Sequence, residues 1–217
     1  MIWQATDNRV QKGILRMYKA VGSRGSRVSR VLWMLEELGQ PYEFVEVALR
    51  SPEAYALNPS GKVPVLIDDD LVVTDSAAIC VYLGDKHADK GMGANPGVTG
   101  RAEMDSWMHF AQSELEAPLW NKLRHRFLLP KDVRVDVGPA AAHDFACEIE
   151  ALDRRLTGRE FALGDRFSAV DVLLGDIGGW ARGGKFKIAS DTVNAYFDRV
   201  LSRPARARAD ANGGSFR

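Results

Sequence analysis

Two short segments of this 217-residue chain carry residue types suited to binding a small charged peptide. The first places Lys62, Val63 and Pro64 at the start of an apolar run. Proline is unusual at the start of a buried strand, because it donates no hydrogen bond to the sheet. A cis Val63–Pro64 bond would turn the chain and leave the backbone of Val63 free to pair with an extended peptide. The segment therefore predicts a peptide-binding edge, with an ordinary trans proline as the alternative.

The second segment is the dipeptide Asp75-Ser76, where a helix is predicted to begin. Free backbone amides and the helix dipole favour an anion such as a carboxylate at a helix N-terminus. The carboxylate of Asp75 can take an ammonium group beside it. The pair suits the head of a γ-glutamyl group, which carries both charges on one carbon. A plain helix cap is the alternative.

Both segments fall within a predicted α/β unit. Apolar residues recur every three or four positions from Val28 to Leu38, which predicts a helix that stops at Gly39. Short β-branched and aromatic runs on either side predict strands. The expected elements are, in chain order, a strand over 14–21, a helix over 28–38, a strand over 42–47, a hairpin over 63–74 and a helix from Asp75 to near His87.

Beyond this unit the pattern changes to helical periods alone. Residues 89–97 are rich in Gly, Pro and Asn and are the predicted linker. Further on, Ser168 followed by Asp171 predicts a capped helix start within an all-α bundle. The predicted organisation is an N-terminal extension over 1–16, an α/β domain over 17–88, the linker over 89–97 and an all-helical C-terminal domain over 98–217.

These features together resemble the cytosolic glutathione transferases, and in particular their serine-type, bacterial-like members. The segments 58–66 and 74–79 resemble the family's glutathione-binding signature, and 30–42 resembles its first helix and the exit from it. The capped start at 167–171 resembles the N-capping motif of the family's second domain. The resemblance extends from about Met17 to Leu201. It implies a thioredoxin-like N-terminal domain followed by an all-α helical bundle.

The resemblance also implies roles for the two peptide-binding segments. Val63, beside Pro64, would pair through its backbone with the cysteinyl part of glutathione. Lys62 would approach a carboxylate of the tripeptide, and Asp75 with Ser76 would hold the γ-glutamyl head. Glutathione is then a co-substrate, and its thiol is the nucleophile.

A thiol with a pKa near 8.5 needs stabilisation to react as a thiolate at neutral pH. A hydroxyl at a helix N-terminus supplies it. The loop after the first strand offers Ser23 and Ser26 but no cysteine, which disfavours a redox member that uses a protein thiol. We favour Ser26, at the predicted helix start. Ser23 stays an alternative, because counting back from Gly39 places the family's usual serine position on Gly25. Tyr18 is a third candidate.

The expected reaction is conjugation of the glutathione thiol to a small electrophile. Trp107 and Phe110, with Trp120, are candidates to line the second-substrate pocket, and a core position is the alternative for them. Two other functions stay open: a glutathione-dependent thiol oxidoreductase or peroxidase, and a non-catalytic binding protein with the same fold. The resemblance also implies a homodimer.

Composition narrows the choice of partners. Lys plus Arg and Asp plus Glu number 29 each, so no net field would attract nucleic acid or an anionic membrane. No apolar run reaches the roughly 18 residues of a membrane span, and the N-terminus is not signal-like. Cys80 and Cys147 stand apart, as expected in a reducing compartment, and the four histidines lack a metal-binding spacing. We therefore expect a cytoplasmic protein with no metal.

Overall fold

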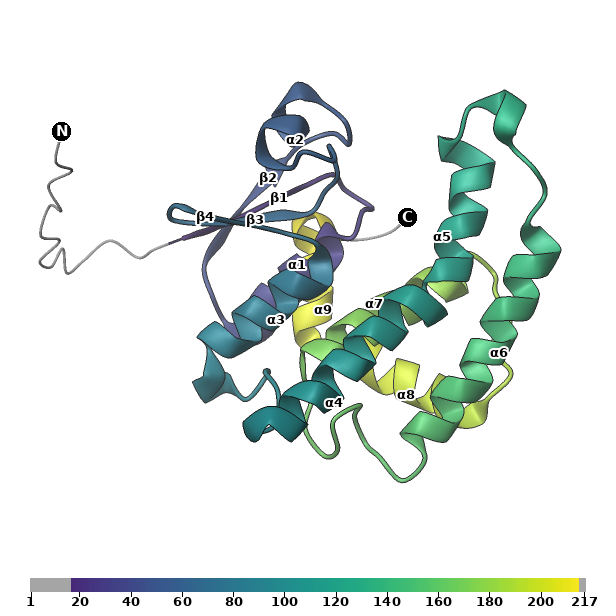
Figure 1. The fold of residues 1–217 in the computed structure, drawn as a ribbon. Coiled ribbons are helices and arrows are strands. Elements are labelled where there is room, and N and C mark those ends of the chain that lie inside the picture. The colour runs from purple at the N-terminus through teal and green to yellow at the C-terminus, as the bar shows by residue number, and fades with distance from the viewer. Residues whose placement is uncertain (1–16, 215–217) are drawn as a thin grey trace, which may run out of the picture.

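The computed structural model describes residues 17–214, and Figure 1 labels its elements. The expected extension over 1–16 lies outside the described residues. The strands are β1 (Tyr18–Gly22), β2 (Tyr42–Glu46), β3 (Val65–Asp68) and β4 (Leu71–Thr74). The α-helices are α1 (Val28–Leu38), α2 (Pro52–Leu57), α3 (Ser76–Lys86), α4 (Gly97–His109), α5 (Ala117–Leu123), α6 (Gly138–Leu156), α7 (Ala169–Gly183), α8 (Asp191–Leu201) and α9 (Pro204–Ala209).

The first half is a four-stranded mixed sheet in the order β2-β1-β3-β4. β1 runs parallel to β2 and antiparallel to β3, and β3 and β4 form the expected hairpin. Helices α1 and α3 lie on one face of the sheet and α2 lies on the other side (Figure 1). This α/β architecture is the one predicted from sequence.

Helix α1 lies between the sheet and the helical half, and nine of its 11 residues are buried. Gly39 ends the helix with φ of 65°, a left-handed conformation that glycine adopts without strain. The Gly39 and Gln40 amides return to the carbonyls of Glu36 and Leu35. The helix therefore stops where the sequence predicts.

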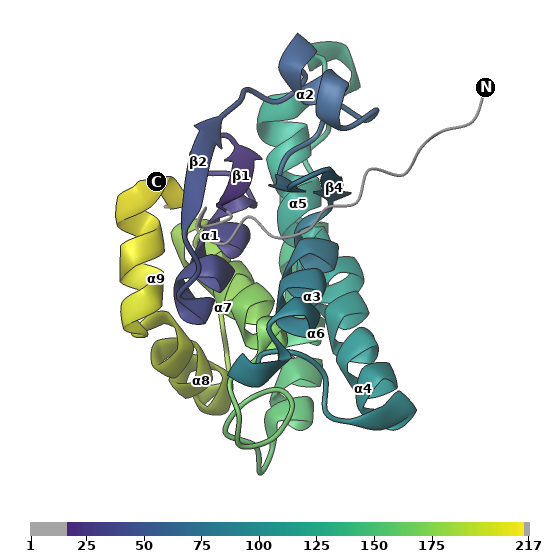
Figure 2. The same cartoon turned by 90° about the vertical axis from the view of Figure 1, so that its left-hand side faces the viewer.

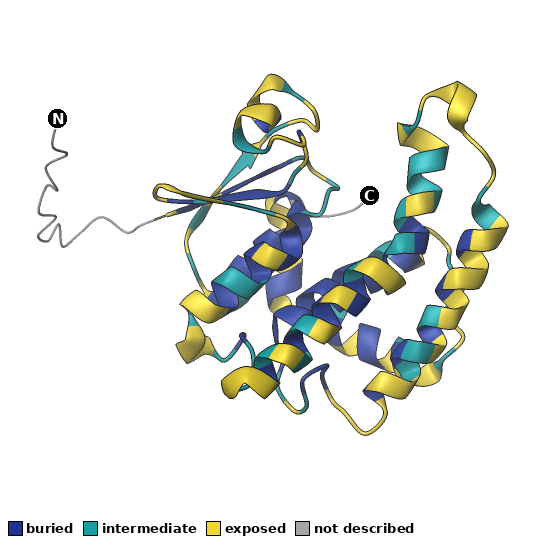
Figure 3. Cartoon of the chain, in the orientation of Figure 1, coloured by how far each residue is buried: buried dark blue, intermediate teal, exposed yellow. Residues whose placement is uncertain are grey.

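Beyond α3, the described residues form helices and connecting loops, with no further strand. Helix α4 continues through π-helical residues Phe110–Leu115 into α5, and α6 returns beside them. Helix α7 lies among the other helices, and α8 and α9 bring the chain back against α1 (Figure 2). Buried positions line the inner surfaces of these helices and of α1 (Figure 3). The predicted α/β domain followed by a helical bundle is thus confirmed as the fold class.

The predicted cap of α7 is present. The carboxylate of Asp171 accepts hydrogen bonds from the Ser168 amide at 2.8 Å, the Ala162 amide at 2.8 Å and the Tyr196 hydroxyl at 2.7 Å. Burial raises the pKa of Asp171 above its ordinary value, while these hydrogen bonds oppose the rise. One side chain therefore joins the helix start to the preceding loop and to α8.

Candidate functional site

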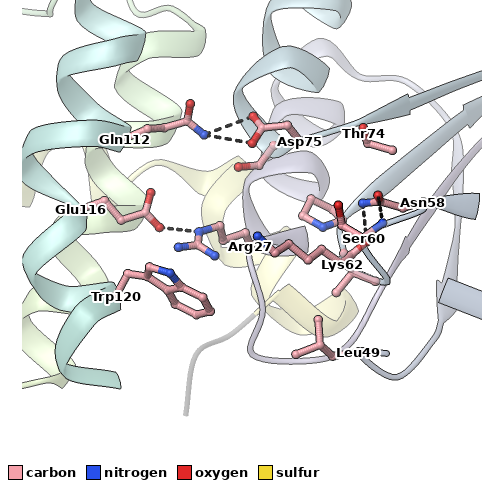
Figure 4. A pocket seen from close by; sticks show the side chains of 13 residues that line it. Arg27, Leu49, Asn58, Ser60, Lys62, Thr74, Asp75, Gln112, Glu116 and Trp120 are labelled. Carbon is pink, nitrogen blue, oxygen red and sulfur yellow. Dashed lines mark hydrogen bonds and ion pairs between the residues drawn. The ribbon is translucent and has the colours of Figure 1, made fainter. Parts of the chain in front are cut away.

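A cavity of about 370 Å³ opens between the sheet half and the α4–α5 segment (Figure 4). The five residues predicted to bind glutathione all line it. They come from the loop before β3 and from the junction of β4 with α3. The opposite wall comes from Gln112, Glu116 and Trp120. The structure therefore brings together in one place Lys62, Val63, Pro64, Asp75 and Ser76.

The Val63–Pro64 peptide bond is cis. Strand β3 begins at Val65, which is paired with Val21 of β1 and Thr74 of β4. Val63 precedes these paired positions and lies on the cavity wall. Its backbone therefore borders the cavity without taking part in the sheet ladder.

Asp75 occupies the N-cap of α3 with φ of 72°, a conformation uncommon for a residue other than glycine. Its carboxylate accepts from the Ala77 amide at 2.9 Å and from the Gln112 side-chain amide at 3.1 and 3.3 Å. The next residue, Ser76, is buried, and its hydroxyl accepts from Arg30 at 3.2 Å. Groups from both halves of the molecule therefore hold this polar corner in place.

Lys62 lies in the loop ahead of β3, at the rim of the cavity. Asn58 orders this loop: its side chain donates to the Lys62 carbonyl at 2.9 Å and accepts from the Ser60 amide at 3.0 Å. Gly61 has φ of 62°, and a Cβ there would come within 2.7 Å of the Tyr55 ring. The loop needs glycine at this point both for its backbone conformation and for space, and Lys62 remains exposed beside it.

Arg27 and Glu116 form a charged part of the wall that sequence reasoning missed. The Nε of Arg27 donates to the Glu116 carboxylate, whose side chain is only 3% exposed. Glu116 also pairs with the fully buried Arg30 at 3.0 Å. Burial by itself would raise the pKa of Glu116, but the charges of Arg30 and Arg27 lower it below its ordinary value. The carboxylate therefore stays ionised at neutral pH.

A smaller, mostly apolar cavity of about 170 Å³ adjoins the first. The two share Arg27, Leu49, Val63 and Trp120, and the smaller one is closed by Leu123, Leu128 and Trp180. Both serine candidates line this smaller cavity. The hydroxyl of Ser26 accepts from the Val28 amide at 3.3 Å, and the Ser26 amide donates to the Ser23 carbonyl at 3.1 Å. Ser26 therefore lies two residues before α1 begins, and its hydroxyl proton is not used in this hydrogen bond.

Trp107 and Phe110 lie in the core of the helical half and line neither cavity, which corrects the expectation placed on them. They are 3% and 6% exposed and meet edge to face, with ring centroids 6.2 Å apart. The Arg155 guanidinium covers both rings. Aromatic side chains at helical spacing pack into the bundle. Of the three aromatic residues expected to line the second-substrate pocket, only Trp120 borders the two cavities.

The third thiolate candidate, Tyr18, lies in the core, and its hydroxyl is hydrogen-bonded to His87 at 2.8 Å.

Within residues 17–214, His, Cys, Asp and Glu side chains form no group of three or more that could hold a metal ion. In the same part of the chain, no helix combines the length and apolar character needed to cross a bilayer.

Comparison with known proteins gives one consistent family. The model of the glutathione S-transferase N-terminal domain matches residues 26–86. Glutathione S-transferase 3 of Zea mays is 30% identical over 153 residues, which cover 67% of this chain and 69% of that protein. Glutathione S-transferase 3 of Schizosaccharomyces pombe is 28% identical over 163 residues, covering 68% and 67%. A sphingomonad glutathione S-transferase solved with glutathione is 29% identical, with a TM-score of 0.78 over 90% of this chain and 98% of that one.

Proposed function

This chain belongs to the glutathione S-transferase family, and we propose that it joins the thiol of bound glutathione to a small electrophile held in the apolar cavity. The observation that carries the proposal is the convergence of the five predicted glutathione-binding residues on one cavity, with an apolar cavity directly beside it. A transferase needs two adjoining sites of this polarity, because one substrate is a charged peptide and the other an apolar electrophile.

Glutathione would lie along the larger cavity, with its γ-glutamyl head at the N-terminus of α3 and its glycine end near Lys62. Its γ-glutamyl head carries a carboxylate and an ammonium group, which suit the α3 N-terminus with Ser76 and the carboxylate of Asp75 respectively. Its cysteinyl part would pair with the backbone of Val63, in the manner of a short added strand. The glycine end would then approach Lys62 at the rim. In this orientation the thiol points to the boundary between the cavities.

At that boundary the Ser26 hydroxyl would donate to the sulfur. The hydroxyl already accepts from the Val28 amide, so its own proton can point to the ligand. A thiolate that accepts this hydrogen bond near the N-terminus of α1 is favoured over the thiol, and its pKa falls. In the reaction the thiol proton passes to solvent, sulfur bonds to the electrophilic carbon, and the leaving group departs with its electron pair. Proximity of the two substrates contributes much of the rate.

The test is a pair of matched variants, Ser26→Ala and Ser23→Ala, each titrated with glutathione while the ultraviolet absorbance of the bound thiolate is followed against pH. We expect the pKa of bound glutathione to lie below the ordinary thiol value of about 8.5 in the wild type and in Ser23→Ala, and to rise by about one unit in Ser26→Ala. A rise only in Ser23→Ala would transfer the role to Ser23. An unchanged pKa in both variants would refute a serine mechanism.

We further propose that the protein is a cytoplasmic homodimer. The family resemblance implies the dimer, and the edge strand β4 offers an uncovered apolar surface, with Leu71 and Val72 45% and 44% exposed. A dimer that covers this strand would remove an aggregation-prone edge. Light scattering after size exclusion should give twice the chain mass for the wild type and the monomer mass for Val72→Glu. A monomeric wild type would refute this part of the proposal.

A further inference from the structure

Among the described residues that line the apolar cavity, Arg27 is the only charged one. The rest of the wall is made by leucine, valine and tryptophan carbon, by Gly25 and by the two serine hydroxyls. A permanent cation in such a wall is costly unless a group of opposite charge meets it. Arg27 is 28% exposed and pairs with Glu116 on one side, and the wall still presents this cation to a ligand of opposite charge.

The guanidinium of Arg27 is held in place by three side chains. Its Nε donates to Glu116. Its Cζ lies 4.6 Å from the ring centroid of Trp120 and 5.7 Å from that of Trp180. Both indoles line the apolar cavity, so the guanidinium is presented between the aromatic faces that would enclose a ligand. Little side-chain entropy remains to be lost when a ligand binds it.

Arg27 shares its carboxylate partner with a second arginine. Glu116 is shared between Arg27 and Arg30, so one carboxylate serves two guanidiniums. The second partner of Arg30 is Asp176, which also pairs with Arg206. Arg206 pairs in turn with Asp210 at 3.0 Å, so among the described residues the network holds three guanidiniums and three carboxylates. Because the hydrogen bond to Glu116 comes from Nε, the two terminal nitrogens of Arg27 offer the fork of donors that matches a carboxylate.

We propose that Arg27 selects electrophiles that carry a carboxylate on an aromatic or otherwise apolar body. This inference rests on the proposed function, because it assigns the second substrate of the same site. The apolar body lies among Trp120, Leu123 and Trp180, and the carboxylate meets Arg27. The carboxylate takes no part in the bond changes: sulfur attacks a different carbon, and the leaving group on that carbon departs with the bonding pair.

The kinetic test uses a chloronitrobenzoate and the matching chloronitrobenzamide, which differ in charge at one position. Each kcat/KM is divided by the uncatalysed rate with glutathione, and the acid-to-amide ratio is compared between variants. We expect Arg27→Met to lower this ratio about tenfold or more, as for the loss of a hydrogen bond between charged groups. Arg27→Lys keeps the charge but loses the fork, so it should restore the ratio only in part.

The matched control is Arg24→Met. Arg24 lies in the same loop, pairs with Glu46 at 3.2 Å and lines neither cavity, so its removal changes the general charge without touching the site. The acid-to-amide ratio should stay within about twofold of the wild type in this variant. An equal fall in Arg24→Met and Arg27→Met would show long-range attraction in place of recognition, and would overturn the inference.

A binding measurement separates this inference from the proposed function. Trp120 and Trp180 flank Arg27, so quenching of tryptophan fluorescence by nitrobenzoate and by nitrobenzamide reports occupancy without turnover. We expect nitrobenzoate to bind more tightly, and the difference to vanish in Arg27→Met. If this holds while no conjugation occurs, the proposed function fails and the inference stands. If Arg27→Met weakens glutathione binding and leaves the acid-to-amide difference intact, Arg27 serves glutathione and the inference is wrong.

Discussion

Replacing the buried Arg30 with methionine should remove the centre of the ion-pair network between the two halves of the molecule. Arg30 is fully buried and contacts Glu116 at 3.0 Å and Asp176 at 2.8 Å, and both carboxylates are almost inaccessible. Although burial by itself would lower the pKa of Arg30, these two carboxylates raise it above its ordinary value, so the guanidinium is charged. Methionine fills similar space but leaves two buried carboxylates with fewer partners.

The expected cost is about 3–5 kcal/mol of unfolding free energy, the usual effect of removing one partner from a buried ion pair. Both carboxylates retain partners in the variant. Asp176 still accepts from the Ser29 hydroxyl at 2.7 Å and pairs with Arg206 at 3.2 Å. Glu116 still pairs with Arg27. We therefore expect a value toward the lower end of that range. With a slope of about 2–3 kcal/mol per molar urea, the unfolding midpoint should fall by about 1–2 M.

The assay is urea unfolding at one fixed protein concentration, followed by the fluorescence of tryptophan. Arg208→Met is the matched control: its ion pair with Glu36 is 2.7 Å long, but the arginine side chain is 54% exposed, so the loss should stay within about 1 kcal/mol. Equal midpoints for Arg30→Met and Arg208→Met would refute the reasoning that burial makes the Arg30 network important.

Three further changes test other parts of the account. Ser76→Ala should weaken glutathione binding about tenfold by calorimetry, because a hydrogen bond to a charged group is lost, and an unchanged affinity would remove Ser76 from the site. The folded-state pKa of Glu116 is lowered, so its contribution to stability is present at neutral pH and is lost as the pH falls through the folded-state pKa. The stability gap between wild type and Glu116→Gln should therefore shrink as the pH falls below the ordinary glutamate pKa, and a constant gap would contradict the assignment. Gly175→Ala should destabilise the folded protein by about 1–3 kcal/mol in thermal unfolding, because the added Cβ would lie 2.7 Å from the Trp33 ring. Gly179→Ala in the same helix would make only an ordinary contact at 3.6 Å and should be neutral or stabilising. The reverse order of stability would refute this packing argument.

Local signals made much of the first half predictable. Gly39 ends α1 because of its own backbone freedom, Pro64 stands just ahead of β3, and Asp75 caps α3 through its own side chain. Each of these features depends on residues within a few positions along the chain. The sequence therefore predicts both the fold class and the five residues that meet at the larger cavity.

The charged wall was not predictable in the same way. An arginine within a helix is usually exposed, and the partners that keep Arg30 buried lie 86 and 146 positions away. The positions of Trp107 and Trp120 depend on the π-helical residues Phe110–Leu115, which change the phase of the helix between them. Neither effect has a local signal, so tertiary packing alone decides which aromatic side chain reaches the cavity.

A crystal structure of the protein with glutathione tests the central claim most directly. The account predicts that the tripeptide occupies the cavity between the two halves, with its cysteinyl backbone paired to Val63, its γ-glutamyl head at Asp75 and Ser76, and its sulfur in hydrogen-bond range of the Ser26 hydroxyl. Glutathione bound elsewhere, or bound there in the opposite direction with its sulfur away from α1, would contradict it.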